Sequence, residues 1–159
     1  MTARSVSSDE LASMPLFRDL PADELASLAA LATRRQLADG ETLFEEGEPA
    51  TTLFHVIHGG LVLRAGGAEG DVIVDTLAPG ELLGWSAIGE GAMTLSAARA
   101  TGDTELIALP VEPIVELAAG GSRRSALLVR RLLGIAASHL QASRQQLLQV
   151  GREGVISGG

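Results

Sequence analysis

The feature that most constrains the fold is a series of short segments rich in β-forming residues, each closed by a turn that contains glycine, between residues 35 and 110. Such turn signals recur at intervals of about 8 to 12 residues, which favours an antiparallel sandwich or barrel over βαβ units. We expect strands in residues 42–44, 52–57, 61–64, 71–77 and 105–109.

Helical patterns flank this β-rich region. Pro21 followed by Asp23 and Glu24 suits a helix start, because Pro is tolerated at the first helical position and acids stabilise the helix N-terminus. Apolar residues at helical spacing then extend a helix of about twelve residues. After Pro110 we expect a short helix at 111–117 and a long helix at roughly 123–150. The predicted fold class is therefore mainly β with flanking helices.

A chain of 159 residues is suited to a single domain with one hydrophobic core. We expect a flexible N-terminal arm at 1–13, a β-rich domain at 14–122, the long helix at 123–150 and a flexible tail at 151–159.

The composition excludes several classes of function. The net charge is −8, and an acidic chain lacks the electrostatic footprint of a protein that binds the phosphate backbone of nucleic acids. The chain has no cysteine, which excludes disulfides and thiolate chemistry. Neither a signal peptide nor an apolar run of about 18 residues is present, so we expect a cytoplasmic protein with no membrane contact.

Two neighbouring segments carry the most specific motif. Residues 79–88 read PGELLGWSAI, and residues 93–100 read MTLSAARA. Together they resemble the phosphate-binding cassette of the cyclic nucleotide-binding domain family, which includes the catabolite-activator and FNR-type regulators. The usual pattern of that family is Gly-Glu-x-x-Gly-Glu, followed further along the chain by Arg-Ser/Thr-Ala.

The resemblance extends over about residues 16–150 and includes two weaker motifs. Residues 40–48 are similar to the family's turn between early strands, and residues 56–62 to its Ile-x-Gly-x-Val strand pair. The resemblance implies an antiparallel β-roll of the double-stranded β-helix or jelly-roll type, with an N-terminal helix and a long C-terminal dimerisation helix. It also assigns turn positions with positive φ to Gly40, Gly47, Gly59, Gly80 and Gly84.

The ligand pocket that the resemblance implies has lost both of its charged anchors. In the family, Glu accepts a bond from the ribose hydroxyl and Arg pairs with the phosphate, whereas Trp85 and Thr94 occupy these positions here. An indole can only donate a hydrogen bond, and threonine supplies no charge. A neutral contact in place of a charged one forfeits about 1 to 2 kcal/mol, and a lost buried Arg–phosphate pair costs more. We therefore expect cyclic AMP and cyclic GMP to bind weakly or not at all.

The remaining frame of the pocket is expected to comprise Gly80, Glu81, Leu83, Gly84, Trp85, Ser86, Ala87, Thr94, Leu95 and Ser96. Trp85 has two interpretations: it fills the vacated pocket as part of the core, or it forms a stacking platform for a flat ligand. Arg64 and Arg99 are the remaining basic candidates nearby, and both are also consistent with solvent-facing strand residues.

The C-terminal helix carries a heptad pattern, with alternating spacings of four and three, at Val129, Leu133, Ala136, Leu140, Ser143, Leu147 and Val150. A helix that lies on its own roll also needs an apolar stripe, but the length and the register favour pairing with the same helix of a second copy. A helix-turn-helix domain would need about 60 further residues after Val150, so we expect no direct DNA binding.

No constellation for catalysis is visible. His55, His58 and His139 lack the spacing of metal ligands, so we expect no catalytic residue, no metal and no cofactor. The leading hypothesis is a stand-alone, dimeric domain that acts as a sensory or protein-interaction module with an unidentified partner. The alternative is a sensor of a different small ligand, nucleotide-like or planar, bound in the pocket of the roll.

Overall fold

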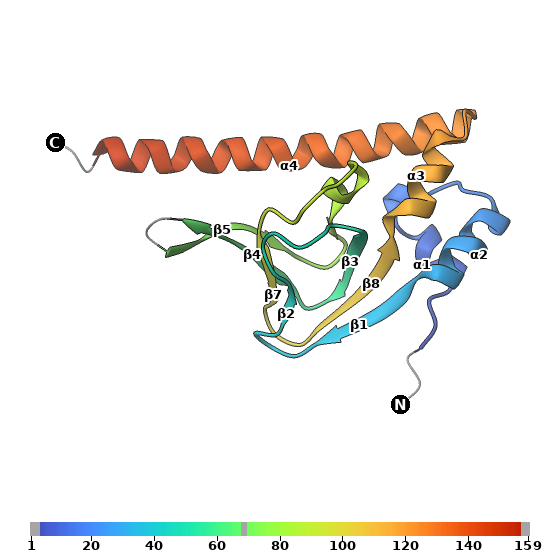
Figure 1. Ribbon diagram of the computed structural model, residues 1–159, viewed down its shortest axis with the longest axis horizontal. Coiled ribbons are helices and arrows are strands. Elements are labelled where there is room, and N and C mark those ends of the chain that lie inside the picture. The colour runs from blue at the N-terminus through green and yellow to red at the C-terminus, as the bar shows by residue number, and fades with distance from the viewer. Residues whose placement is uncertain (1–3, 68–69, 157–159) are drawn as a thin grey trace.

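A computed structural model of the chain describes residues 4–67 and 70–156 (Figure 1). The helices are α1 (Ser8–Ala12), α2 (Ala22–Leu31), α3 (Val111–Ala119) and α4 (Arg123–Ile156), with 3-10 turns η1 (Pro15–Phe17) and η2 (Trp85–Ile88). The strands are β1 (Thr33–Leu37), β2 (Thr42–Phe44), β3 (Thr52–His58), β4 (Leu61–Gly67), β5 (Gly70–Leu77), β6 (Leu82–Leu83), β7 (Ala97–Ala100) and β8 (Thr104–Pro110).

The strands form two four-stranded sheets with antiparallel pairing, in the orders β1-β8-β3-β6 and β2-β7-β4-β5. The helices lie outside the roll that these sheets build, with α3 and α4 following the last strand (Figure 1). The predicted fold, mainly β and antiparallel with flanking helices, is confirmed.

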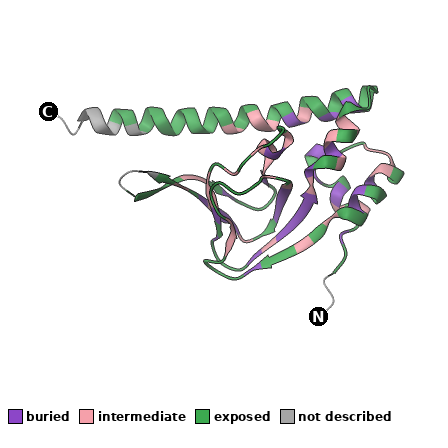
Figure 2. Cartoon of the chain, viewed as in Figure 1, coloured by how far each residue is buried: buried purple, intermediate pink, exposed green. Residues whose placement is uncertain are grey.

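Strand β8 is the centre of the packing because both of its faces are buried. Successive side chains of a strand point to opposite faces. Leu106 and Ala108 accordingly belong to the core between the two sheets, while Ile107 and Leu109 pack against the helices. The buried colouring along this strand in Figure 2 reflects the double burial. The sheet that contains β8 is therefore the middle layer of three.

Each interface of this middle layer has its own apolar cluster. The cluster between the sheets contains Leu37, Phe54, Val56, Leu61, Leu63, Leu77, Leu83, Ala98, Ala100, Leu106 and Ala108. The cluster under the helices includes Leu11, Phe17, Leu28, Leu53, Ile107, Leu109, Ile114 and Leu128.

The N-terminal segment 1–13, expected to be a flexible arm, contains the helix α1 in its described part. Ser7 caps α1, because its hydroxyl accepts a bond from the Glu10 N–H at 3.2 Å while the Ser7 N–H donates to the Glu10 carboxylate at 2.8 Å. This reciprocal capping box satisfies two otherwise free backbone donors. Leu11, fully buried, then fixes the helix to the core.

Helix α4 continues to Ile156, so it extends into the segment 151–159 that was expected to be a flexible tail. Residues 157–159 lie outside the described residues. Strands β4 and β5 form a hairpin whose pairing extends to Gly67 and Gly70, and residues 68 and 69 lie outside the described part of the chain.

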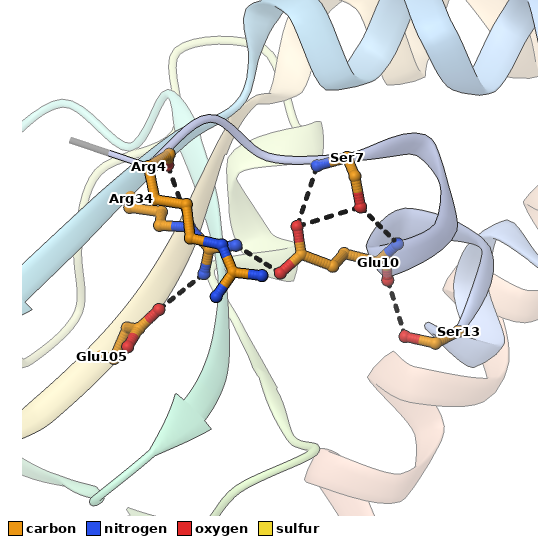
Figure 3. A network of polar contacts seen from close by, with 6 residues as sticks. All are labelled: Arg4, Ser7, Glu10, Ser13, Arg34 and Glu105. Carbon is orange, nitrogen blue, oxygen red and sulfur yellow. Dashed lines mark hydrogen bonds and ion pairs between the residues drawn. The ribbon is translucent and has the colours of Figure 1, made fainter. Parts of the chain in front are cut away.

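A buried guanidinium joins α1 to the middle sheet (Figure 3). The Arg34 side chain, 7% exposed, donates to a Glu105 carboxylate oxygen at 2.5 Å and to the Glu10 carboxylate. Its Nε donates to the Arg4 carbonyl at 3.0 Å. The Ser7 backbone N–H, followed by the Arg34 guanidinium, lowers the pKa of the Glu10 carboxyl to about 2.

We expect Glu10→Gln to reduce the free energy of unfolding near pH 7 by about 1.5–3 kcal/mol, the range for hydrogen bonds to charged groups. Because the pKa of Glu10 is lower in the folded chain than in the unfolded chain, its ionised form stabilises the fold above the unfolded value. That stabilisation is lost as the pH falls from about 4.5 toward about 2. Urea unfolding near pH 7 and near pH 3 measures this, and the difference between wild type and variant should narrow at the lower pH.

Glu90→Gln is the matched control, because Glu90 is exposed and its side chain makes no hydrogen bond or ion pair with the described residues. A stability difference between wild type and Glu10→Gln that stayed constant across this pH range would contradict the assigned role of the Glu10 carboxylate.

Candidate functional site

A cavity of about 340 Å³ opens between the two sheets and is bordered by α4. Its wall is mostly apolar, formed in large part by Leu43, Phe44, Pro49, Ala50, Phe54, Leu63, Val74, Leu83, Trp85 and Leu95. A concave, largely apolar site with a few polar groups has the general form of a small-molecule pocket.

Most of the predicted pocket residues line this cavity, namely Leu83, Gly84, Trp85, Ser86, Thr94, Leu95 and Ser96. Three do not. Gly80 and Glu81 lie in the turn before β6 and border a separate cavity of about 200 Å³. Ala87 is buried and packs in the core under the helices.

The separate cavity lies between the N-terminal turn η1, strand β3 and helix α4. His55 lines it from β3 and is 8% exposed, and burial lowers the pKa of this imidazole. His139 on α4 borders both cavities. The His139 side chain is thus part of the wall of both cavities.

Gly84 determines how the cassette approaches the roll. Its φ is +94°, and a Cβ at this position would lie 2.4 Å from the Thr52 carbonyl oxygen. Glycine alone takes this conformation without strain and leaves room for the strand beside it. The 3-10 turn η2 therefore begins directly against β3. The other predicted positions, Gly40, Gly47, Gly59 and Gly80, also have positive φ.

Thr94, at the family's arginine position, is part of the backbone framework. Its hydroxyl donates to the Glu45 carbonyl at 2.6 Å and accepts from the Glu48 N–H at 2.9 Å. The Thr94 N–H donates to the Glu48 carbonyl, and the Gly47 N–H donates to the Thr94 carbonyl, both at 2.8 Å. The Thr94 side chain thus closes the turn between β2 and β3.

Trp85 forms part of the cavity wall and is half-buried. Its ring stacks on His139 of α4, with centroids 5.8 Å apart and planes inclined by 26°. The His139 Nδ1 lies 3.4 Å from a carboxylate oxygen of Asp75 on β5. Trp85 therefore borders the open cavity and also packs against the apolar cluster under the helices.

A β-bulge explains how Asp75 comes to line the cavity together with its neighbour Val74. Leu63 pairs with Asp75, but Arg64 pairs with Ile73, so Val74 is an extra residue in β5. A regular strand points neighbouring side chains to opposite faces, whereas a bulge changes this alternation locally. Asp75 faces inward with its partner Leu63, and Val74 lies beside it on the cavity wall.

The ionisable side chains around the cavity are Glu48, Asp75 and His139. Arg64 and Arg99 are both exposed and neither belongs to the lining, in agreement with the alternative that they are solvent-facing strand residues. Among the described residues, no arginine lines the cavity.

Helix α4 presents the predicted heptad leucines to solvent, with Leu133 65%, Leu140 71% and Leu147 74% exposed. Val129 is also exposed and Ala136 is half-buried, while the Val150 side chain lies outside the described residues. Ser143 differs from the other members of the pattern because it borders the cavity.

Sequence reasoning missed 13 of the 20 residues that line the cavity, including the side chains from β2, β3, β4, β5 and α4. The inward-facing apolar residues of the strands could have been found from the alternation of apolar and polar residues along each strand. Asp75, His139 and Ser143 carried none that identified the cavity, because their placement depends on the bulge and on how α4 lies across the roll.

Within residues 4–67 and 70–156, no group of three or more His, Cys, Asp or Glu side chains has the arrangement of a metal site. Over the same part of the chain, no helix is both long enough and apolar enough to cross a membrane.

Comparisons with known proteins place this geometry in a family. The family model for the cyclic nucleotide-binding domain matches residues 34–120, which is more than half of the chain. A segment of 56 residues, 35% of the chain, is 36% identical to a Rhodopseudomonas palustris protein provisionally named a potassium channel protein, and it spans 14% of that protein.

Two solved structures share the fold. The catabolite activator protein of Thermus thermophilus is 28% identical, with a TM-score of 0.67 over 86% of this chain and 63% of that chain. A cyclic nucleotide-binding domain from Methylobacillus flagellatus is 16% identical, with a TM-score of 0.76 over 93% of this chain and 88% of that chain. The chain thus spans a small part of the curated relative and less than two thirds of the catabolite activator. With its β-roll, its cassette glycines and the match over residues 34–120, the chain belongs to the cyclic nucleotide-binding domain family.

Proposed function

We propose that this chain is a homodimeric, non-enzymatic sensory domain whose pocket does not bind cyclic AMP or cyclic GMP tightly. The observation that carries the proposal is the use of Thr94. Its hydroxyl is engaged with the Glu45 and Glu48 backbone, so the position that would hold a phosphate offers neither a charge nor a free donor.

The electrostatics of the cavity support the same conclusion. A cyclic nucleotide carries a negative phosphate, and buried phosphates are held by guanidinium groups and charge-assisted bonds. The lining instead contains the carboxylates Glu48 and Asp75. Their field raises the free energy of a bound phosphate, because like charges repel.

A second candidate function is the binding of a small molecule that is not a cyclic nucleotide. The observation that favours it is the open cavity of about 340 Å³ with Trp85 on its wall. An apolar pocket with an aromatic ring and a few polar groups is suited to a planar or apolar ligand.

Homodimerisation is supported by the exposed leucines of α4. Leu133, Leu140 and Leu147 are each more than 60% exposed and recur every seven residues along one helix face. A heptad of apolar side chains is the pattern by which two helices bury a shared seam. The partner we propose for this face is the α4 helix of a second copy.

We expect isothermal titration calorimetry of the wild-type chain with cyclic AMP and with cyclic GMP to give no dissociation constant below about 10 μM, which corresponds to about −7 kcal/mol. The reason is the absence of a charged partner for the phosphate at position 94. A dissociation constant below that value for either nucleotide would show that other groups in the cavity hold the phosphate.

We expect Thr94→Val to lower the free energy of unfolding by about 1–2 kcal/mol, because it removes two hydrogen bonds and leaves their backbone partners unpaired. Thr94→Ser keeps the hydroxyl and should stay near the wild-type value. Urea unfolding of the three proteins measures the effect, and equal stabilities of the Val and Ser variants would contradict the structural role of the hydroxyl.

We expect Leu140→Glu to convert the dimer into a monomer, because two carboxylates would face each other in an apolar seam. Leu140 is 71% exposed in the single chain, so the substitution should leave the fold intact. Gln145→Glu is the control, since it introduces the same side chain at an exposed position on the opposite side of α4 and should remain dimeric. Multi-angle light scattering at high micromolar concentration distinguishes the two states. A wild type that is monomeric under these conditions would refute the seam.

A further inference from the structure

We propose that the roll cavity selects a cationic ligand with an apolar body, an organic amine or ammonium compound, and that Asp75 is its counter-ion. The proposal rests on the second candidate function above, the binding of a small molecule other than a cyclic nucleotide.

The Asp75 carboxylate lies on the cavity wall, and its side chain is 31% exposed. One oxygen accepts a bond from the Thr76 N–H at 2.8 Å, and the other lies 3.4 Å from the His139 ring nitrogen. A carboxylate can accept about four hydrogen bonds, so Asp75 keeps free capacity for a ligand donor.

The side chains around the cavity carry a net negative charge. The ionisable lining groups are the carboxylates of Glu48 and Asp75 and the imidazole of His139. Two negative charges and at most one positive charge leave the lining negative in either state of the imidazole. Low-dielectric walls focus such a field into a cleft, so the cavity attracts cations and repels anions.

An aromatic and apolar wall accompanies these charges. The Trp85 indole borders the cavity, and tryptophan is the side chain that attracts cations most strongly through its ring face. Phe44, Phe54 and Leu63 supply apolar surface for the body of the ligand. A carboxylate and an indole in one apolar cavity are the combination that recognises an ammonium group.

Binding of an ammonium at Asp75 would also affect α4. The ligand would compete with His139 for the same carboxylate, and that contact joins α4 to β5. Occupation of the cavity therefore loosens one of the contacts that hold the helix against the roll.

The test uses three probes with the same biphenyl ring system and different charges: 4-biphenylmethylamine, 4-biphenylmethanol and biphenyl-4-carboxylate. Dissociation constants are measured by calorimetry and, in parallel, by the fluorescence of Trp85, the single tryptophan of the chain. We expect the amine to bind at least about tenfold more tightly than the alcohol, a difference of about 1.4 kcal/mol, and the carboxylate to bind most weakly.

The variant Asp75→Asn should remove the preference for the amine and leave the affinity for the alcohol unchanged. Asp71→Asn is the matched control, because Asp71 is exposed on the same strand and does not border the cavity. Should Asp75→Asn fail to fold, the affinity ranking of the three probes on the wild-type chain still decides the proposal.

The outcomes distinguish the charge selection by Asp75 from the binding of small molecules in general. Binding of the alcohol or the carboxylate at least as tightly as the amine, or an equal loss of amine and alcohol affinity in Asp75→Asn, would overturn the charge selection and leave the pocket function standing. Binding of none of the three probes would refute the small-molecule function and this inference with it.

Discussion

Strand β8 holds the two halves of the molecule together because its side chains are buried on both faces. Leu106 and Ala108 complete the core of the roll, and Ile107 and Leu109 provide the floor on which the helices pack. Glu105 of the same strand also accepts a hydrogen bond from Arg34, which reaches α1 on its other side. Because β8 contacts the helices on one face, the way in which the helices pack bears directly on the sheet that forms one wall of the cavity.

The cavity combines the backbone of a nucleotide pocket with a different electrostatic character. Gly84 still makes the close approach to β3 that starts the 3-10 turn of the cassette. Thr94 makes two hydrogen bonds to a neighbouring turn, so its side chain serves the framework and not a ligand. The shape of a pocket depends on such backbone contacts, whereas its preference for a ligand depends on a few side chains. Here the backbone contacts of the cassette are present, and we propose that the side chains select a different ligand.

Sequence reasoning predicted β2, β3, β4, β5 and β8 because glycine turns and apolar alternation are local signals, but it gave no range for β1, β6 and β7. It gave no helix for α1, where one fully buried leucine, Leu11, and a capping box support a helix in a segment that reads as polar. It also missed Asp75, because a one-residue bulge changes the alternation of β5 without any mark in the sequence. His139 was missed for a different reason: the phase of α4 against the roll depends on tertiary packing, which a heptad pattern alone does not determine.

The long helix α4 packs on the roll in its N-terminal part, while residues 141–149 are all exposed. Helix formation in water is cooperative but marginal for short segments without tertiary support. We therefore expect the last turns of α4 in a single chain to lie closer to a helix–coil equilibrium than the packed part, and amide exchange to become faster along the helix after His139. Any surface that covers Leu140 and Leu147 would shift this equilibrium toward helix. The number of residues of α4 that are helical would then show whether its exposed face is covered.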